Sequence, residues 1–218
     1  EMEESRLQKQ VNYEQIFLIA REKDQFYNQL YLIDKNNNLE HKQRIFDLFF
    51  FTEKLRDACE MKFRSQILNT EFNLNMLEEV LNEVNQNWTY YQNHPSILIY
   101  SSIYKTLTHN ELSYYSDTVD VLRENETWLL LSELQNIYNY LQNYCIRQIN
   151  RGKQTFLGEL FKIYQSQLEK GLLLVDHFLP EWHYKNIVTT GLRLQENDWV
   201  GAFIEEYKEL LKPSIREN

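Results

Sequence analysis

Apolar residues at helical spacing dominate the last sixty residues of the chain and limit what it can fold into. Between Trp199 and Leu211 they recur every three or four positions, and Glu205, Glu206 and Lys208 fall between them. This period forms one apolar stripe of a helix that packs on a partner, while the charged residues face water. Residues 187–194 carry the same pattern. The stretch therefore predicts two amphipathic helices that pack on each other.

A short polar link joins these two helices. Residues 195–198 separate them, and so short a link makes consecutive helices antiparallel neighbours. Asp198 is the expected N-cap, because its carboxylate would lie at the positive end of the second helix. Gly191 and Ala202 are small residues inside the helices, which predicts a close approach of the two backbones. Trp182 and Trp199 lie at helix starts and are expected to pack over the neighbouring hairpin, and Phe203 is expected to pack as part of the apolar stripe.

Glycine and proline mark helix boundaries further upstream. Gly152 and Gly171 follow helical patterns and are expected to end them, while Pro95 and Pro180 suit the start of a helix. The two stretches that begin at these prolines have the same length and the same short link between two helices. The sequence therefore predicts a repeated helical hairpin with a period of roughly 33 to 45 residues.

The N-terminal part carries longer helical patterns. Residues 3–33 form one or two helices, and the asparagines at 36–38 stop the pattern because their side chains bond to the local backbone in turns. From Glu40 to Leu68 apolar residues cover more than one face. This predicts a central helix with contacts on two sides.

The chain has 5 Gly and 3 Pro in 218 residues, too few for the turns of an all-β or α/β protein. We predict an all-α fold of about four stacked antiparallel hairpins, an α-solenoid behind a long N-terminal helical segment. A single domain is expected over 1–218, with N-terminal helices at 1–70 and the hairpin array at 71–218. Its termini suggest a fragment of a longer protein, which could associate with itself through uncapped terminal hairpins.

Several stretches resemble known helical-repeat proteins. GLRLQENDWVGAFIEEYKELL and FKIYQSQLEKGLLL resemble tetratricopeptide and pentatricopeptide repeats. YKNIVTTGLRLQENDWVGAFIEEYK, KLRDACEM and NYCIRQINRGK resemble an uncharacterised group of bacterial proteins, mostly from Bacteroidetes, over roughly residues 50–213. The first resemblance implies stacked helical hairpins. The second implies relatives that continue into further repeats, and it implies no activity.

Charge and cysteine content bear on partners and compartment. The net charge of −9 disfavours nucleic-acid binding, which depends on Lys and Arg, and makes a basic partner easier to accept. Cys59 and Cys145 lie in apolar helical patterns far apart in sequence, so we expect buried, reduced thiols and a cytoplasmic protein. No apolar run is long enough to span a membrane, and no membrane association is expected.

The sequence carries no motif of a nucleotide-binding site, a metalloprotease or a nucleophilic hydrolase. We therefore predict that the protein is not an enzyme and has no cofactor. The best metal-like group spans a proline and is not expected to bind metal; its members are Asp176, His177, Glu181 and His183. The glutamate clusters at 78–83 and 205–209 are interpreted as solvated helix faces.

Tyrosines are the remaining candidates for binding, because tyrosine is enriched at interfaces. We predict a non-catalytic scaffold that binds a protein or an extended peptide with such side chains. The alternative is an RNA-binding protein of pentatricopeptide type, which the acidic charge disfavours. An enzyme would need converging titratable groups that the sequence does not show. The partner-binding candidates are Tyr90, Tyr91, Tyr100, Tyr104 and Tyr138.

Overall fold

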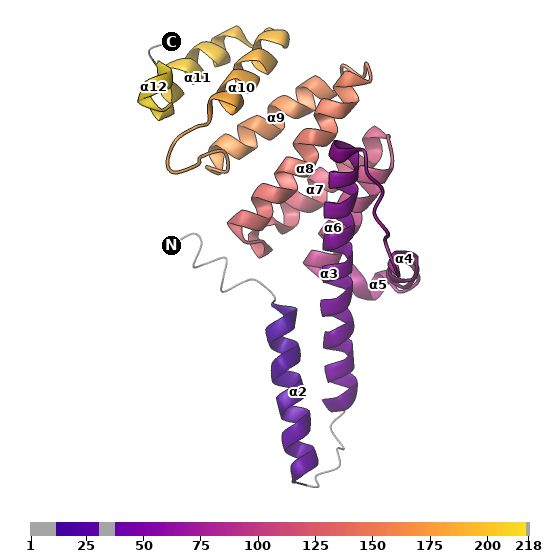
Figure 1. The fold of residues 1–218 in the computed structure, drawn as a ribbon. Coiled ribbons are helices and arrows are strands. Elements are labelled where there is room, and N and C mark those ends of the chain that lie inside the picture. Colours follow the sequence, from indigo (N-terminus) through magenta and orange to yellow (C-terminus); the bar gives the residue numbers. More distant parts are fainter. Residues whose placement is uncertain (1–11, 31–37, 217–218) are drawn as a thin grey trace. The chain divides into compact units, whose positions relative to one another are not determined.

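The computed structural model describes residues 12–30 and 38–216 (Figure 1). Of these residues 80% are helical, and none forms a strand beyond an isolated bridge between Val175 and Phe178. The predicted all-α class is confirmed. The expectations for residues 3–11, 31–33 and 36–37 lie outside the described residues.

The chain divides into two compact units, unit 1 up to Leu130 and unit 2 from Leu131. The sequence predicts one domain with an internal boundary near residue 70, whereas the compact units divide sixty residues later. Each unit has its own buried apolar side chains, and each is described here by itself.

Unit 1 is built on one long helix, α3, which contacts α2, α6 and α4. Its buried residues Leu48, Leu55, Ala58 and Cys59 lie on the side shared with these neighbours. Contacts on more than one side are what its broad apolar pattern predicts. The elements of unit 1 are α2 (Tyr13–Gln29), α3 (Asn38–Leu68), α4 (Leu77–Gln86), α5 (Trp88–Tyr91), α6 (Pro95–Thr108), α7 (Leu112–Asn125) and the 3-10 turn η1 (Glu126–Trp128).

Polar bonds fix how the helices of unit 1 align. The Gln66 amide donates to the Leu107 carbonyl at 2.8 Å and so ties the end of α3 to the end of α6. The hydroxyls of Thr106 and Thr118, both buried, lie 2.8 Å apart between α6 and α7. Thr118 also donates to the Ser102 carbonyl. A buried hydroxyl without a hydrogen-bond partner is costly, and a shift of α7 along α6 would break these bonds. The two threonines therefore favour one alignment of the α6–α7 hairpin.

Unit 2 is a succession of helices in which each packs on the next: α8 on α9, α9 on α10, and α10 on α11. The links at 151–155 and 194–196 are short, so α8 with α9 and α10 with α11 form helical hairpins. The elements are α8 (Leu131–Asn150), α9 (Phe156–Glu169), α10 (Glu181–Arg193), α11 (Asn197–Tyr207), η2 (Lys208–Leu210) and α12 (Pro213–Arg216).

Helices end where the sequence predicts a glycine stop. Gly152 and Gly171 take positive φ angles of 90° and 66° after α8 and α9. The next N–H reaches back to a carbonyl in the last helical turn, as in the Leu172 to Gln167 bond of 2.8 Å, which is the Schellman arrangement. Asn69 and Gln195 end α3 and α10 in the same way without being glycine.

The predicted N-cap of the last hairpin is wrong by two residues. The capping position of α11 is Glu196, whose side chain makes no capping hydrogen bond, and Asp198 lies inside the first turn. Gln195 takes a left-handed conformation between the two helices, and α11 already begins at Asn197, one residue before the predicted cap. The Asp198 carboxylate still lies at the positive end of the helix dipole.

The close approach at Gly191 involves a different partner from the predicted one. Ala202 is exposed, and the side chain that faces Gly191 is Val200. Trp199 packs as expected, since its ring lies 4.7 Å from that of Phe161 and is stacked on that of Phe203 at 5.4 Å. Phe203 is buried. The hairpin is therefore held by Val200 and the aromatic rings.

Replacing Gly191 by alanine should destabilise the protein. A Cβ at this position would lie 2.5 Å from Val200 Cγ2 and 3.3 Å from Phe161 Cε2. Val200 is buried and β-branched, so its methyl group cannot rotate away freely. Overpacking costs about 1–3 kcal/mol, more than the gain of up to about 1 kcal/mol in helix propensity. We expect a lower melting temperature for Gly191→Ala and a still lower one for Gly191→Leu.

Gly201 provides the matched control in the facing helix. A Cβ there meets nothing within 4 Å. Gly201→Ala should therefore stabilise the protein by about 0.5–1 kcal/mol, because alanine favours the helix. Equal stabilisation by alanine at both positions would mean that Gly191 is not tightly packed.

Gln195→Gly should also stabilise the protein. The exposed Gln195 takes φ of 62°, a conformation that costs energy for a residue with a Cβ and none for glycine. Part of the gain is offset by the greater freedom of glycine in the unfolded chain, so we expect about 0.5–1 kcal/mol from chemical denaturation. A loss of stability would show that the Gln195 side chain makes contacts worth more than the strain.

Candidate functional site

The loop after α3 separates that helix from α4 and shapes a groove of unit 1. Two residues with left-handed backbones bound the loop, Asn69 with φ of 51° and Met76 with φ of 60°. Between them residues 70–74 run without regular structure. The Lys54 ammonium donates to the Asn75 carbonyl at 3.3 Å, which fastens the far end of the loop to α3.

An open groove of about 610 Å³ lies between this loop and the last turns of α3, and we call it the α3–α4 groove. Its floor and walls combine apolar side chains with Lys62 and Glu71 as the charged residues. The volume is within the range of sites that hold a small ligand or a few side chains of a peptide. The lining residues are Met61, Lys62, Ser65, Asn69, Thr70, Glu71, Phe72 and Leu74.

Four large apolar side chains in the loop and in the adjoining turn of α3 are exposed to solvent. Ile67 and Leu68 in the last turn of α3 are 60% and 61% exposed, Phe72 is 39% exposed, and Met76 is 55% exposed. Of these four, Phe72 lines the groove. Single exposed apolar residues are ordinary, but four within ten residues of the chain favour an interaction site. The groove is therefore our candidate for a binding site in unit 1.

The sequence pattern does not reveal the exposure of Ile67 and Leu68, because both continue the apolar helical pattern that runs from Glu40 to Leu68. The signal for a binding surface is the position of Phe72 and Leu74 in an asparagine-rich stretch, where a short segment has no helix face to bury them.

Unit 2 has a smaller apolar pocket of about 220 Å³ beside Trp182. The prediction that Trp182 packs over a neighbouring hairpin is not met, because the side chain is 62% exposed and its ring contacts that of His183. Trp182 lies in the first turn of α10, and its side chain points out of the helix pair. The pocket is lined by Val175, Phe178, Leu179, Pro180, Glu181, Trp182, Lys212 and Ile215.

The tyrosines predicted to contact a partner are largely inside the core. Tyr91, Tyr100 and Tyr138 are 6%, 2% and 8% exposed, so their rings offer no surface, and Tyr104 is half-buried. The expectation fails for the buried three because their helices are covered on the sides that carry these rings. Tyr90 is the candidate that remains exposed, at 42%.

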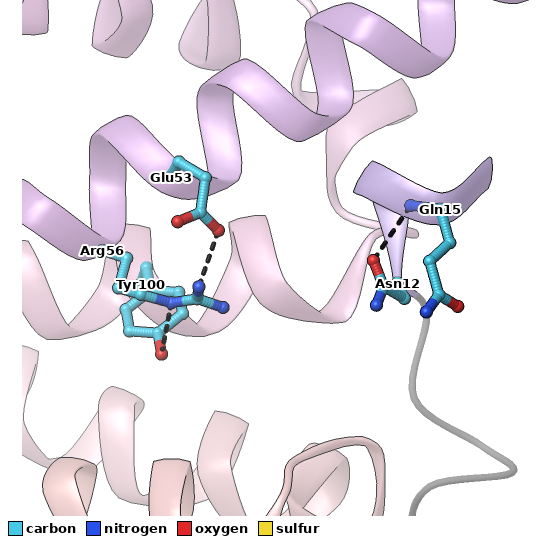
Figure 2. Close-up of polar contacts among 5 residues, drawn as sticks. All are labelled: Asn12, Gln15, Glu53, Arg56 and Tyr100. Atoms are coloured by element: carbon cyan, nitrogen blue, oxygen red, sulfur yellow. Dashed lines mark hydrogen bonds and ion pairs between the residues drawn. The ribbon is translucent and has the colours of Figure 1, made fainter. Parts of the chain in front are cut away.

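Two of these tyrosines use their hydroxyls within unit 1. Figure 2 shows Arg56 of α3 between Glu53 of the same helix and Tyr100 of α6. The guanidinium donates to the Glu53 carboxylate at 2.6 Å and to the Tyr100 hydroxyl at 3.3 Å. Tyr91 donates to Glu83 at 3.3 Å, and burial raises the pKa of its hydroxyl. These contacts join helices and are structural.

A polar cavity of about 250 Å³ lies beside the Arg56 cluster. Asn12 caps α2 at its rim, where its side chain accepts a hydrogen bond from the Gln15 N–H at 3.1 Å (Figure 2). Glu14 and Glu53 line it together with Arg56. The cation is already paired with Glu53, so the cavity has no strong preference for a charged ligand.

In the parts of the chain that the structure describes, no three His, Cys, Asp or Glu residues gather closely enough to hold a metal ion. Asp176 and His177 form the tip of a tight turn, with φ of 51° and 67°. Cys59 and Cys145 are buried thiols that form no disulfide, and burial raises the pKa of Cys59.

Comparisons with known proteins add no assignment. No family model, curated protein or solved structure matches the chain. The resemblance to the Bacteroidetes group therefore stays a prediction. Among the helices that the structure describes, none is both long enough and apolar enough to cross a membrane.

His94 makes the stability of unit 1 sensitive to acid. Its Nδ1 lies 2.9 Å from the Tyr13 hydroxyl of α2, and the residue occupies the N-cap of α6. Burial lowers the pKa of His94, and a cation at a helix N-terminus is unfavourable. Burial likewise lowers the pKa of His183 in unit 2.

The free energy of unfolding should therefore fall as the pH is lowered from about 7 to about 5. Below about pH 6.5 the unfolded chain binds protons at these histidines more readily than the folded chain does. Denaturation at several pH values measures this slope. His94→Gln should flatten it, and adding His183→Gln should flatten it further. A slope unchanged in both variants would contradict the assignment.

Proposed function

We propose that the protein is a non-catalytic scaffold of helical hairpins that binds another protein or an extended peptide. Hairpins of this kind, α6 with α7, α8 with α9, and α10 with α11, are the building unit of tetratricopeptide-like arrays, which bind partners on their surfaces. The buried thiols Cys59 and Cys145 agree with a reducing compartment such as the cytoplasm.

The α3–α4 groove is the observation that carries the proposal. Burial of its exposed apolar side chains by a partner would contribute about 25 cal/mol of binding free energy for each Å² of apolar surface removed from water. Phe72 and Met61 would supply much of that area, since an aromatic ring and a flexible thioether suit varied partners. Anchoring by apolar side chains in a groove is how helical and extended peptides are held.

The composition of the groove favours binding over catalysis. Its lining has one lysine, one glutamate and two hydroxyl groups, without histidine or cysteine. General acid–base chemistry needs titratable groups that converge on one point. A groove in which the apolar residues are exposed and the charged residues face water suits a docking role.

Selection from a random peptide library displayed on phage tests the proposal. We expect peptides that bind the protein and lose at least tenfold in affinity to Phe72→Ser, because the ring is a central anchor. Leu112→Ser is the matched control: Leu112 is a 45% exposed apolar residue on α7, outside the groove lining. Selected peptides that bind both variants as well as the parent would refute the groove as the docking site.

A further inference from the structure

The chain that follows the last arginine of α3 carries side-chain charge of one sign over residues 65–104. No Lys or Arg occurs between Arg64 and Lys105, a stretch that contains four glutamates. Glu71 lies in the groove lining, and Glu78 and Glu79 follow in the first turn of α4, four and five residues after the lining residue Leu74. All three are exposed. The loop side of the groove is therefore acidic.

Two of the cations on the opposite wall, formed by α3, are paired with carboxylates of the same helix. Arg64 is paired with Glu60, and Arg56 with Glu53. The Lys54 ammonium bonds to a loop carbonyl. Lys62 is the cation that lines the groove. In unit 2, by contrast, eleven acidic residues are balanced by ten basic ones over residues 131–218.

We infer that the α3–α4 groove binds a basic amphipathic peptide segment, with apolar side chains against Met61, Phe72 and Leu74 and Lys or Arg side chains over Glu71, Glu78 and Glu79. This inference rests on the proposed function and names the class of partner. Charge complementarity selects such a segment among apolar ones, because like charges across an interface are penalised.

Other occupants fit the same charges less well. An acidic peptide would bring its carboxylates to a loop that has no cation of its own. A second copy of the chain carries a net charge of −9, so two copies repel each other. Nucleic acid would place phosphates beside three exposed glutamates.

Two synthetic peptides of equal length test the inference. Both carry the same apolar helical face with leucine and phenylalanine anchors; one has lysines and arginines on its polar face, and the other has glutamates. Fluorescence anisotropy should show at least tenfold tighter binding of the basic peptide at 0.15 M salt. The difference in affinity should shrink at 0.5 M salt, because salt screens the charges, while the apolar contacts that the two peptides share persist.

Neutralising the two charged residues of the groove should change the affinity for the basic peptide in opposite directions. Glu71→Gln removes an attraction and should weaken the basic peptide about two- to fivefold. Lys62→Gln removes a repulsion and should strengthen it by a similar factor. Glu124→Gln on α7 changes the net charge equally, outside the groove, and should leave the affinity nearly unchanged. Phe72→Ser should abolish binding of the basic peptide.

The outcomes separate the charge inference from the proposed function. Preference for the acidic peptide, or the reversed signs at Glu71 and Lys62, would overturn the inference while Phe72-dependent docking stands. Equal weakening by Glu71→Gln and Glu124→Gln would show unspecific attraction to an acidic protein and would overturn it too. If neither peptide binds and library peptides ignore Phe72, the proposed function fails as well.

Discussion

The length of α3 is the constraint on which unit 1 depends. At 31 residues it extends roughly 46 Å, while α6 extends roughly 21 Å, at 1.5 Å per residue. Arg56 and Gln66 bond to α6, and Lys42 pairs with Asp24 of α2, so different neighbours cover different parts of α3. A helix that serves several partners must be apolar on several sides. In its last turn Gln66 bonds to α6, whereas the neighbouring Ile67 and Leu68 are exposed.

Apolar packing alone would not choose a single alignment of these helices. Leucine, isoleucine and valine surfaces tolerate small shifts along a helix, whereas a buried polar atom without its partner costs about 1–3 kcal/mol. The bond from Gln66 to the Leu107 carbonyl and the buried pair of Thr106 and Thr118 exist in one alignment. Burial therefore supplies the driving force, and a few polar contacts select the structure that it stabilises.

Local signals predict much of the fold. Helical spacing identifies most helices, Pro95 begins α6, and Gly152 and Gly171 end helices at positive φ. The left-handed Gln195 and Met76 have no such signal, because their side chains do not favour that conformation. They are held there by the helices on either side.

The exposure of individual aromatic residues is less predictable, for a tertiary reason. Tyr90 and Tyr91 are adjacent in the chain and alike in chemistry, yet one is exposed and the other is buried against Phe51. The difference depends on where α3 lies relative to a four-residue helix. Nothing in the local pattern encodes that position. The same holds for Trp182, whose place at a helix start does not reveal whether another element covers it.

The negative charge of the loop and of the first turn of α4 bears on self-association and on the choice of partner. Exposed apolar side chains invite association with any other apolar surface, and nearby like charges oppose that association among copies of the same chain. Glu71, Glu78 and Glu79 supply this repulsion next to Phe72 and Met76. Repulsion of acidic surfaces is at the same time attraction for basic ones. If the α3–α4 groove binds the basic segment that we infer, the glutamates that oppose self-association would also favour partners that carry lysine and arginine around an apolar anchor.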